Sequence, residues 1–339
     1  MQKISRRKFV AGTALAALAA PAILSRPANA AEFTYKFANN TPPDHPLNVR
    51  AREAAAKILE ETGGRLEIAL YPSNQLGSDT NTLSQVRAGA VELFSLSAII
   101  LSTLIPDTAI TGVGFAFKSY DQVWAGVDGP LGAFVRKRIE STGLVVFDNL
   151  WDIGYRQITT GAKPIHDPGD LEHLRIRVPP GPLWTSIFQS LGAAPSTLNF
   201  NELYTALQTK VFDAQENPLS IIETVKLYEV QKYVSMTNHM WDGLWLLANK
   251  DAWNALPANI REIAARHLNA AAKSERDDIR HLNESLEAGL TAHGLVFNRP
   301  DAAPFQEVLR KAGFYRDWKG KFGADAWGLL EQAAGAQLA

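Results

Sequence analysis

The pattern of apolar and polar positions in residues 31–97 predicts strands and helices in alternation. Short apolar or alternating runs, which are typical of strands, cover 33–38, 65–71 and 91–96. Stretches with apolar residues at helical spacing lie between them, at 47–59 and 80–89. Gly63-Gly64 follows the first of these stretches as a helix stop signal. This order predicts a parallel α/β unit, in which ligands bind at loops beyond the carboxyl ends of the strands.

The later segments continue this mixture of helices and strands. One or two amphipathic helices are expected over 119–143, and apolar strands are expected at 144–150, 157–160 and 242–248. The longest pattern is helical and runs from 257 to 292, where Pro257 suits the first turn. Such a helix is about 50 Å long, enough to span two lobes. A coiled-coil helix is the alternative, although the apolar positions do not keep a strict heptad.

The segment 171–218 carries the clearest sign of a binding site. The alternating run 175–178 predicts a strand, and the two prolines that follow it end that strand. Arg177 is therefore expected at a strand end, beside a break where a cleft can open. Asn217 is expected in an acidic turn over 213–218. A guanidinium and a carboxamide displayed at such places suit a small anionic ligand.

The first 30 residues have the features of an export signal. Arg6-Arg7 fits a twin-arginine pattern, an alanine-rich apolar stretch follows, and Ala28-Asn29-Ala30 fits a cleavage site. A membrane anchor is the alternative, but the apolar run is shorter than the ~20 residues that a spanning helix needs. We therefore expect a twin-arginine signal peptide at 1–30 and a periplasmic protein.

Charge and composition narrow the classes of partner. Removing the five basic residues of the expected signal from the chain's 34 leaves 29 basic against 35 acidic residues. A net negative chain argues against nucleic acid or an anionic membrane as a partner. There is no cysteine, and the seven histidines show no metal-ligand spacing. No glycine-rich phosphate loop or nucleophile elbow occurs, so we expect no metal, no cofactor and no catalytic residue.

Several runs of this chain resemble the solute receptors of TRAP transporters (tripartite ATP-independent periplasmic transporters, DctP type). These runs read YPSNQLGSD at 71–79, GYRQITT at 154–160, HLRIRVP at 173–179, FNELYTALQT at 200–209, FDAQENP at 212–218 and KLYEVQKY at 226–233. The resemblance covers most of the chain after residue 30. A long ordered match of this kind is far more specific than a single short motif.

The resemblance implies a fold, a mechanism and a set of partners. The fold is α/β, a two-lobed periplasmic binding protein with a ligand cleft between the lobes and a long helix braced along both. We expect lobe I at 31–154 plus 243–282 and lobe II at 155–242 plus 283–339. The lobes would close over a small organic acid, and the closed form would dock on a permease with small and large membrane subunits.

The resemblance also implies ligand-binding residues, each of which has a simpler structural explanation. Arg177 would bind the ligand carboxylate in bidentate fashion, or else form a structural salt bridge. Arg156 would be a second donor, and Asn217 a third unless it caps the next helix. The other candidates are polar residues near strand ends, apolar walls and the crossing segment, with strand termination or core packing as their alternatives: Asn40, Asp79, Ser97, Trp184, Phe200, Trp151 and Asp152. Arg175 is expected to be exposed.

The ligand expected from these residues is a hydroxylated monocarboxylate, between a short hydroxy acid and a sugar acid. Ser97 and Ile100 stand where sialic-acid receptors of the family carry an acidic residue and an arginine, so sialic acid is not expected. Two other classes remain open from the sequence. An exported enzyme acting on a carboxylate would need a base or nucleophile beside Arg177, and a structural adaptor would bind no small molecule.

Overall fold

One mixed sheet of ten strands organises residues 31–339, the part of the chain that the computed structural model describes. Along its main path the strands follow the order β2 (Leu66–Tyr71), β1 (Phe33–Ala38), β3 (Leu93–Ser97), β9 (Tyr233–Asn249), β5 (Trp151–Thr160), β8 (Ala214–Pro218), β6 (Arg175–Val178) and β7 (Ala194–Thr197). Two short strands, β4 (Leu144–Val146) and β10 (Val296–Asn298), pair with β9. The expected signal peptide lies outside the described residues.

The parallel α/β unit expected near the N-terminus is confirmed. β1 pairs in parallel with both β2 and β3, and helices α1 (Pro46–Glu61) and α2 (Asp79–Ala88) connect these strands. In α1, Pro46 lies in the first turn, and the His45 side chain accepts a hydrogen bond from the Leu47 amide. Leu47, Ala51, Ala54 and Ile58 are buried at helical spacing, so one face of α1 packs into the core.

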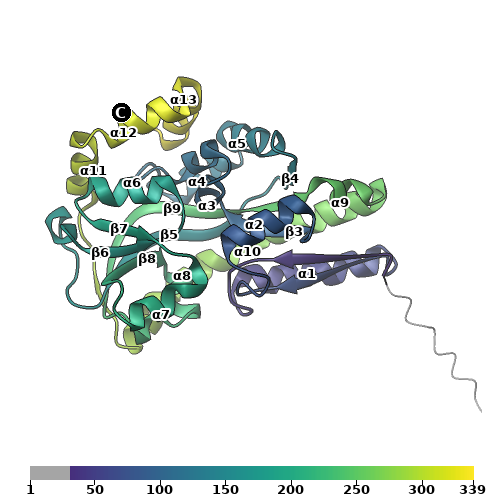
Figure 1. Ribbon diagram of the computed structural model, residues 1–339, viewed down its shortest axis with the longest axis horizontal. Coiled ribbons are helices and arrows are strands. Elements are labelled where there is room, and N and C mark those ends of the chain that lie inside the picture. The colour runs from purple at the N-terminus through teal and green to yellow at the C-terminus, as the bar shows by residue number, and fades with distance from the viewer. Residues whose placement is uncertain (1–30) are drawn as a thin grey trace, which may run out of the picture. The chain divides into compact units, whose positions relative to one another are not determined.

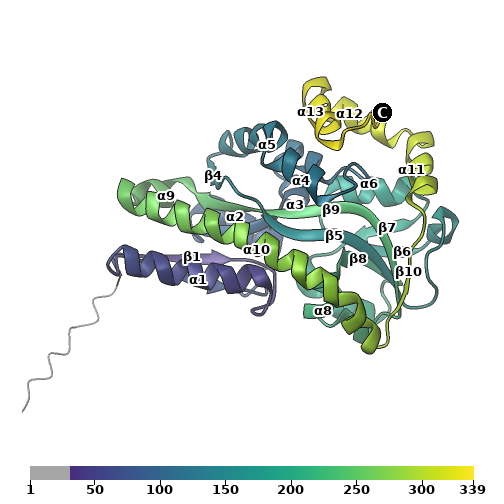
Figure 2. The same ribbon diagram turned by 180° about the vertical axis from the view of Figure 1, so that it is seen from behind.

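β5 and β9 are longer than the strands expected at 157–160 and 242–248. β5 has 10 residues and β9 has 17, and they pair antiparallel in the middle of the sheet (Figures 1 and 2). β9 continues the first unit by pairing with β3, whereas β5 continues toward β8 and β6. The ladder is irregular between Asp152 and Gly154 and between Arg156 and Ile158. β5 and β9 therefore join the first parallel unit to the strands β8, β6 and β7, and their own pairing has two breaks in register.

The expectation of an acidic turn over 213–218 is wrong. Residues Ala214–Pro218 form β8, which is buried throughout and lies between β5 and β6. Its polar side chains are tolerated in the interior because each has hydrogen-bond partners there; for example, the Gln215 amide donates to Thr159 Oγ1 at 2.8 Å. Asn217 is therefore fixed in a strand and not displayed on a loop.

The long helix expected from residue 257 is confirmed as α10 (Ala258–Ala292), which has 35 residues. Ile260, Ala264 and Leu268 in its first half pack in a hydrophobic cluster with α1 and β1, whereas Leu286 and Leu290 pack in a separate cluster with α7 (Leu203–Gln208). Figure 2 shows α10 running along the sheet from α9 (Lys250–Ala255) to β10. Its apolar stripe is buried within the same chain, which removes the reason for expecting a coiled-coil partner.

The other helices fill the remaining layers. The expected break near Gly129-Pro130 separates α4 (Tyr120–Val127) from α5 (Pro130–Glu140), and α3 (Ala98–Leu101), α6 (Pro182–Ser190) and α8 (Leu219–Thr224) follow strands β3, β6 and β8. The C-terminal helices α11 (Ala302–Lys311), α12 (Phe314–Phe322) and α13 (Ala324–Ala334) contact α4, α5 and α6. Residues 31–339 form one compact unit. The boundaries of lobes I and II given above remain a prediction.

Candidate ligand-binding site

A small cavity, with a volume of about 30 Å³, lies where the carboxyl ends of β1, β3, β6 and β8 meet inner residues of β5 and β9. Eight of the ten residues expected to bind the ligand line it: Asn40, Asp79, Ser97, Arg156, Arg177, Trp184, Phe200 and Asn217. Its other walls are Ile100, Ile153, Pro179, Ile221, Asp242 and Leu244. Residues from between positions 40 and 244 therefore converge at one place.

Arg177 has a donor that is buried and unpaired. Its Nε and Nη2 donate to the Leu198 carbonyl oxygen, with Nε at 2.8 Å, while Nη1 has no hydrogen-bond partner in the described chain. β6 places this side chain in the interior, because Ile176 and Val178 on either side are also buried. Burial lowers the pKa of Arg177 to about 9, so the guanidinium is still charged at pH 7. It can therefore bind an anion.

Arg175, two residues earlier, is exposed as expected. It forms a bidentate pair with Asp213, with Nε and Nη2 at 2.8 and 2.7 Å from the carboxylate oxygens. The two arginines of β6 thus differ in environment, and only Arg177 reaches the cavity.

Arg156 also lines the cavity, but its donors are already engaged. Nε and Nη2 donate to the Glu216 carboxylate, Nη1 donates to Asp242 at 3.2 Å, and Nη2 contacts Asn217 Oδ1 at 3.1 Å. Its guanidinium also lies over the Trp184 ring, 4.9 Å from the centroid. Burial opposes the charge, but Glu216 and Asp242 raise the pKa of Arg156 above its usual value. As a donor to a ligand it is therefore less available than Arg177.

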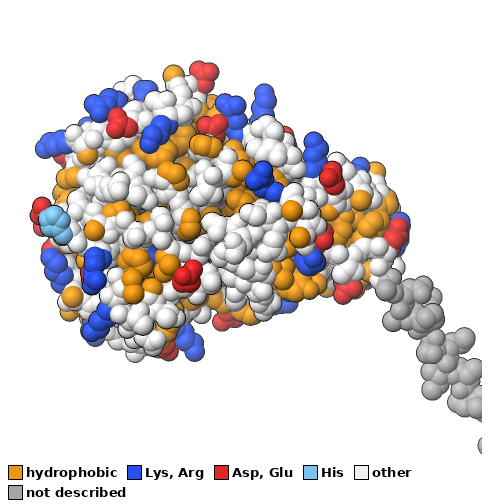
Figure 3. Space-filling model, viewed as in Figure 1, with side chains coloured by type: hydrophobic (Ala, Val, Ile, Leu, Met, Phe, Trp, Pro, Cys, Tyr) orange, Lys and Arg blue, Asp and Glu red, His pale blue; other side chains and the backbone are white. Residues whose placement is uncertain are grey.

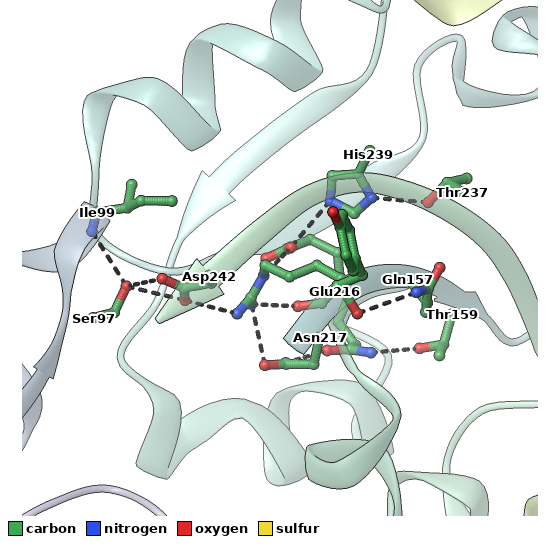
Figure 4. A network of polar contacts seen from close by, with 12 residues as sticks. Ser97, Ile99, Gln157, Thr159, Glu216, Asn217, Thr237, His239 and Asp242 are labelled. Carbon is green, nitrogen blue, oxygen red and sulfur yellow. Dashed lines mark hydrogen bonds and ion pairs between the residues drawn. The ribbon is translucent and has the colours of Figure 1, made fainter. Parts of the chain in front are cut away.

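Glu216, the partner of Arg156 on β8, was not assigned to the site from the sequence. Glu216 also accepts from His239 Nε2 at 3.2 Å, and His239 Nδ1 lies 2.8 Å from Thr237 Oγ1 (Figure 4). Burial acts to raise the pKa of Glu216, but the positive charge of Arg156 holds it below its usual value. A charged residue inside an otherwise apolar run, such as Asp242 within 240–248, is the sequence signal that could have found this network.

Ser97 joins the network through Asp242. Its hydroxyl donates to the two Asp242 carboxylate oxygens at 2.8 and 3.0 Å and accepts from the Ile99 amide, at the start of α3 (Figure 4). Burial raises the pKa of Asp242 to about 6. On the opposite wall, Asn40 and Asn74 each donate to one oxygen of Asp79 at 3.0 Å. Burial also raises the pKa of Asp79.

The alternative role for Asn217 as a helix cap is not observed. α8 begins after Pro218 and has no side-chain cap, whereas the Asn217 amide donates to Gln215 and its oxygen accepts from Arg156. The expected apolar walls are present. Trp184 is fully buried and its Nε1 has no partner in the described chain, and Phe200 is half-buried at the cavity edge.

Trp151 and Asp152 do not line the cavity, contrary to expectation. Trp151 packs in the hydrophobic cluster of α1 and the first half of α10. Asp152 Oδ1 accepts from Trp241 Nε1 at 2.9 Å, and its backbone amide donates to Glu275 of α10 at 2.9 Å. The irregular pairing after Asp152 brings Ile153 to the cavity instead, and nothing in the hydrophobic pattern predicts that shift.

Metal sites, membrane-spanning helices and surface charge can also be examined in residues 31–339. Between 31 and 339, no group of three or more His, Asp or Glu residues is placed to hold a metal ion. No helix in that range combines the length and hydropathy needed to cross a membrane. Acidic and basic side chains are interspersed on the face that Figure 3 displays.

Comparisons with known proteins identify the family. The chain is 36% identical over 311 residues to the Sinorhizobium fredii protein y4mM, covering 91% of this chain but only 56% of that longer relative. It is 28% identical to the 2,3-diketo-L-gulonate-binding periplasmic protein YiaO of Escherichia coli, over 91% of this chain and 92% of the relative.

A solved structure supports the same assignment. A TRAP periplasmic solute-binding protein from Sulfurospirillum deleyianum, with bound succinate, superimposes with a TM-score of 0.85 at 25% identity, covering 91% of this chain and all of that one. The fold is thus that of the two-lobed TRAP receptors. Residues 37–315 match the family DctP, described as bacterial extracellular solute-binding protein, family 7. The chain belongs to this family, as its sequence motifs indicated.

Proposed function

We propose that this protein is a periplasmic receptor that binds a hydroxylated monocarboxylate between two lobes and delivers it to a TRAP membrane permease. The observation that carries the proposal is that Arg177 lines the cavity and that its buried Nη1 has no hydrogen-bond partner in the described chain. A carboxylate oxygen at this atom would form a charge-assisted hydrogen bond in a site that excludes water. Family membership and the succinate-bound neighbour support the binding of a small acid.

The charge of the site favours one carboxylate on the ligand over two. Arg156 is compensated by Glu216 and Asp242, so Arg177 is the cation of the cavity that has a donor left. A second carboxylate would face Asp79 or Asp242 without a cation of its own. Burial of an unpaired charge is costly, and like charges repel at short range.

The remaining polar groups favour hydroxyls on the ligand. Asp79 and Asp242 are buried acceptors at the cavity wall, and each can accept a further hydrogen bond from a ligand hydroxyl. The E. coli relative is named for 2,3-diketo-L-gulonate, which is itself a hydroxylated monocarboxylate. Sugar acids and short hydroxy acids therefore fit this wall better than an unsubstituted dicarboxylate does.

Lobe closure is the mechanism that this architecture favours. The predicted boundaries between lobes I and II fall within β5, β9 and α10. β5 has a register shift beside Gly154, whose φ of +108° only glycine adopts readily. A small rotation at this irregular pairing would open the cavity for the acid to enter. The closed form would present one continuous surface to the small and large permease subunits.

An exported enzyme remains the second candidate from the sequence, and the site gives it little support. Within residues 31–339 the cavity walls include Ser97, but its hydroxyl is bound to Asp242, and His239 lies behind Glu216. A nucleophile needs a base within hydrogen-bond reach. We therefore propose binding without turnover. Incubating the purified protein with the bound acid and recovering it unchanged would support this.

Competition binding tests the proposed ligand class. The protein without residues 1–30 would be titrated by calorimetry with lactate, glycerate, erythronate, gluconate and glucuronate, and with succinate and malate. We expect at least one hydroxylated monocarboxylate to bind more tightly than either dicarboxylate. If succinate or malate binds most tightly, the cavity contains a second available cation and the proposal is wrong.

A further inference from the structure

A second cavity, with a volume of about 210 Å³, adjoins the one that contains Arg177. The two cavities share Asn40 and Phe200 as lining residues. The walls of the second cavity come from the loops after β1 and β2 and from the segment that begins at Phe200, with Val225 and Leu227. We refer to the cavity at Arg177 as the inner cavity and to the second as the outer chamber.

The outer chamber differs from the inner cavity in charge. Its walls have no ionised side chain: six are apolar or aromatic and four are neutral and polar. They are Pro42, Phe200, Leu203, Tyr204, Val225 and Leu227, with Asn40, Ser73, Asn74 and Asn201. The inner cavity, by contrast, is lined by two arginines and two aspartates. A ligand that occupies both spaces would therefore have one charged end and one uncharged end.

Phe200 and Asn40 lie at the junction of the two spaces, since both residues line each of them. Phe200 is half-buried on a three-residue 3-10 turn, η3 (Phe200–Glu202), and packs against two separate hydrophobic clusters. The Asp79 carboxylate accepts one hydrogen bond from Asn40, which both cavities share, and one from Asn74 of the outer chamber. The two spaces therefore adjoin at Phe200 and at the amide of Asn40.

The sizes of the two spaces suggest how a ligand would be divided between them. The inner cavity of about 30 Å³ has room for about two water molecules, since a cavity needs ~10–15 Å³ to hold one. This is little more than a carboxylate and its nearest carbon require. The outer chamber is seven times larger. The part of an acid beyond its first few atoms therefore has room on the far side of Phe200.

We propose that the outer chamber is a subsite for the uncharged, largely apolar tail of an acid whose carboxylate is bound at Arg177. The inference rests on the proposed function, since it assumes that carboxylate anchor, and it narrows the ligand class to monocarboxylates with a tail of several carbons. A terminal carboxylate in the outer chamber would lack a cation, so the chamber also discriminates against long dicarboxylates.

A homologous series of acids tests the subsite directly. Calorimetry would compare lactate, 2-hydroxybutyrate, 2-hydroxyhexanoate and 2-hydroxyoctanoate, with adipate as the dicarboxylate of six carbons. Burial of a methylene group is worth ~0.8 kcal/mol, about fourfold in affinity. We expect affinity to rise roughly two- to fourfold per added methylene up to six carbons, and we expect adipate to bind more weakly than 2-hydroxyhexanoate.

Substitutions in the outer chamber separate this subsite from the carboxylate anchor. Asn201→Phe, at an exposed position of the wall, should fill the chamber and weaken 2-hydroxyhexanoate at least tenfold while lactate changes less than twofold. Val225→Phe approaches from another segment and should give the same pattern. Thr205→Phe is the matched control, because Thr205 is exposed on the neighbouring helix and lines neither cavity.

The outcomes distinguish the two proposals. Equal affinities across the series, or equal losses for lactate and 2-hydroxyhexanoate in Asn201→Phe, would overturn the subsite and leave the monocarboxylate receptor intact. Failure of every acid in the series to bind would overturn the subsite, and failure of the sugar acids named above to bind as well would overturn the receptor for hydroxylated monocarboxylates. Thermal unfolding of each variant shows whether a loss of affinity reflects a loss of folding.

Discussion

Replacing Arg177 by lysine removes the geometry of the anchor and keeps its charge. In the structure the guanidinium uses Nε and Nη2 for the Leu198 carbonyl, and its buried Nη1 is without a partner in residues 31–339. A lysine has one ammonium group at the end of a flexible chain. It can satisfy the carbonyl or reach a ligand carboxylate, but it cannot present donors in both directions from a planar group.

The expected loss follows from the number of bonds removed. A hydrogen bond to a charged group contributes about 1.5–3 kcal/mol, so losing one should weaken binding roughly 10- to 150-fold. Burial adds to the loss, since it disfavours a charged ammonium and lowers the pKa of a buried lysine. We therefore expect the Arg177→Lys protein to fold and to bind its preferred acid at least tenfold more weakly.

Isothermal titration calorimetry measures the change, and the same strand provides the control. Arg175→Lys makes the same chemical substitution two residues away, at an exposed side chain paired with Asp213. Exposed ion pairs contribute little, so this control should bind within twofold of the wild type. An Arg177→Lys protein that is folded and also binds within twofold would refute the assignment of Arg177 as the carboxylate anchor.

Three further predictions follow from the crossing segments. If the lobes close, small-angle scattering should show a smaller radius of gyration with saturating ligand; superimposable curves would contradict closure. Burial raises the pKa of Asp152 to about 7, so the folded state retains a proton that the unfolded state releases above pH 4. The free energy of unfolding should then fall as pH rises from about 4 to 7, on the order of 2–4 kcal/mol, and chemical denaturation of Asp152→Asn should show a flatter profile; an unchanged profile would exclude Asp152 as its source. Gly154→Ala should destabilise by about 1–3 kcal/mol because φ is +108° and the new Cβ would lie 3.4 Å from the Tyr120 hydroxyl. Gly289→Ala, in the last turn of α10 with no neighbour within 4 Å, should stabilise by about 0.5–1 kcal/mol in urea titrations; the opposite order of the two alanine variants would contradict this reading.

The hydrophobic pattern predicted correctly those helices and strands that bury one face at a regular spacing along their whole length. The apolar stripe of α10 and the alternating run of β1 are buried on a regular period, so the sequence places them within a residue or two. β8 was mistaken for a turn because its residues are polar although it is buried throughout. The side chains that hydrogen-bond to the polar residues of β8 belong to β5 and β9, and the sequence of 213–218 alone does not show that these strands lie beside it.

The candidate site shows the same limit. Motif resemblance located Arg177 and Asp79 at the cavity because each lies within a run that matches the family pattern, and the position of Asn40 just after a predicted strand located that residue. It did not reveal that Arg156 is held by Glu216 and Asp242, because that network joins three strands. The placement of Asp152 failed for a local reason, since one irregular pair after it changes which side chain of β5 reaches the cavity.

Six of the ten buried side-chain polar atoms without hydrogen-bond partners in residues 31–339 lie where the proposed function requires ligand binding or lobe movement. Of the ten such side-chain atoms in residues 31–339, two belong to the cavity, at Arg177 and Trp184, and four lie where β5 passes α10, at Trp151, Asp152, Tyr155 and Glu275. An unsatisfied buried group costs about 1–3 kcal/mol, so a chain under selection for stability alone would pair them. A ligand carboxylate can supply the partner at Arg177. At the crossing of β5 and α10, a rotation of the strands can expose the same groups to water, which lowers the free-energy difference between open and closed forms. Unsatisfied groups thus support the proposed anion binding at Arg177 and, at other residues, the proposed movement of the lobes.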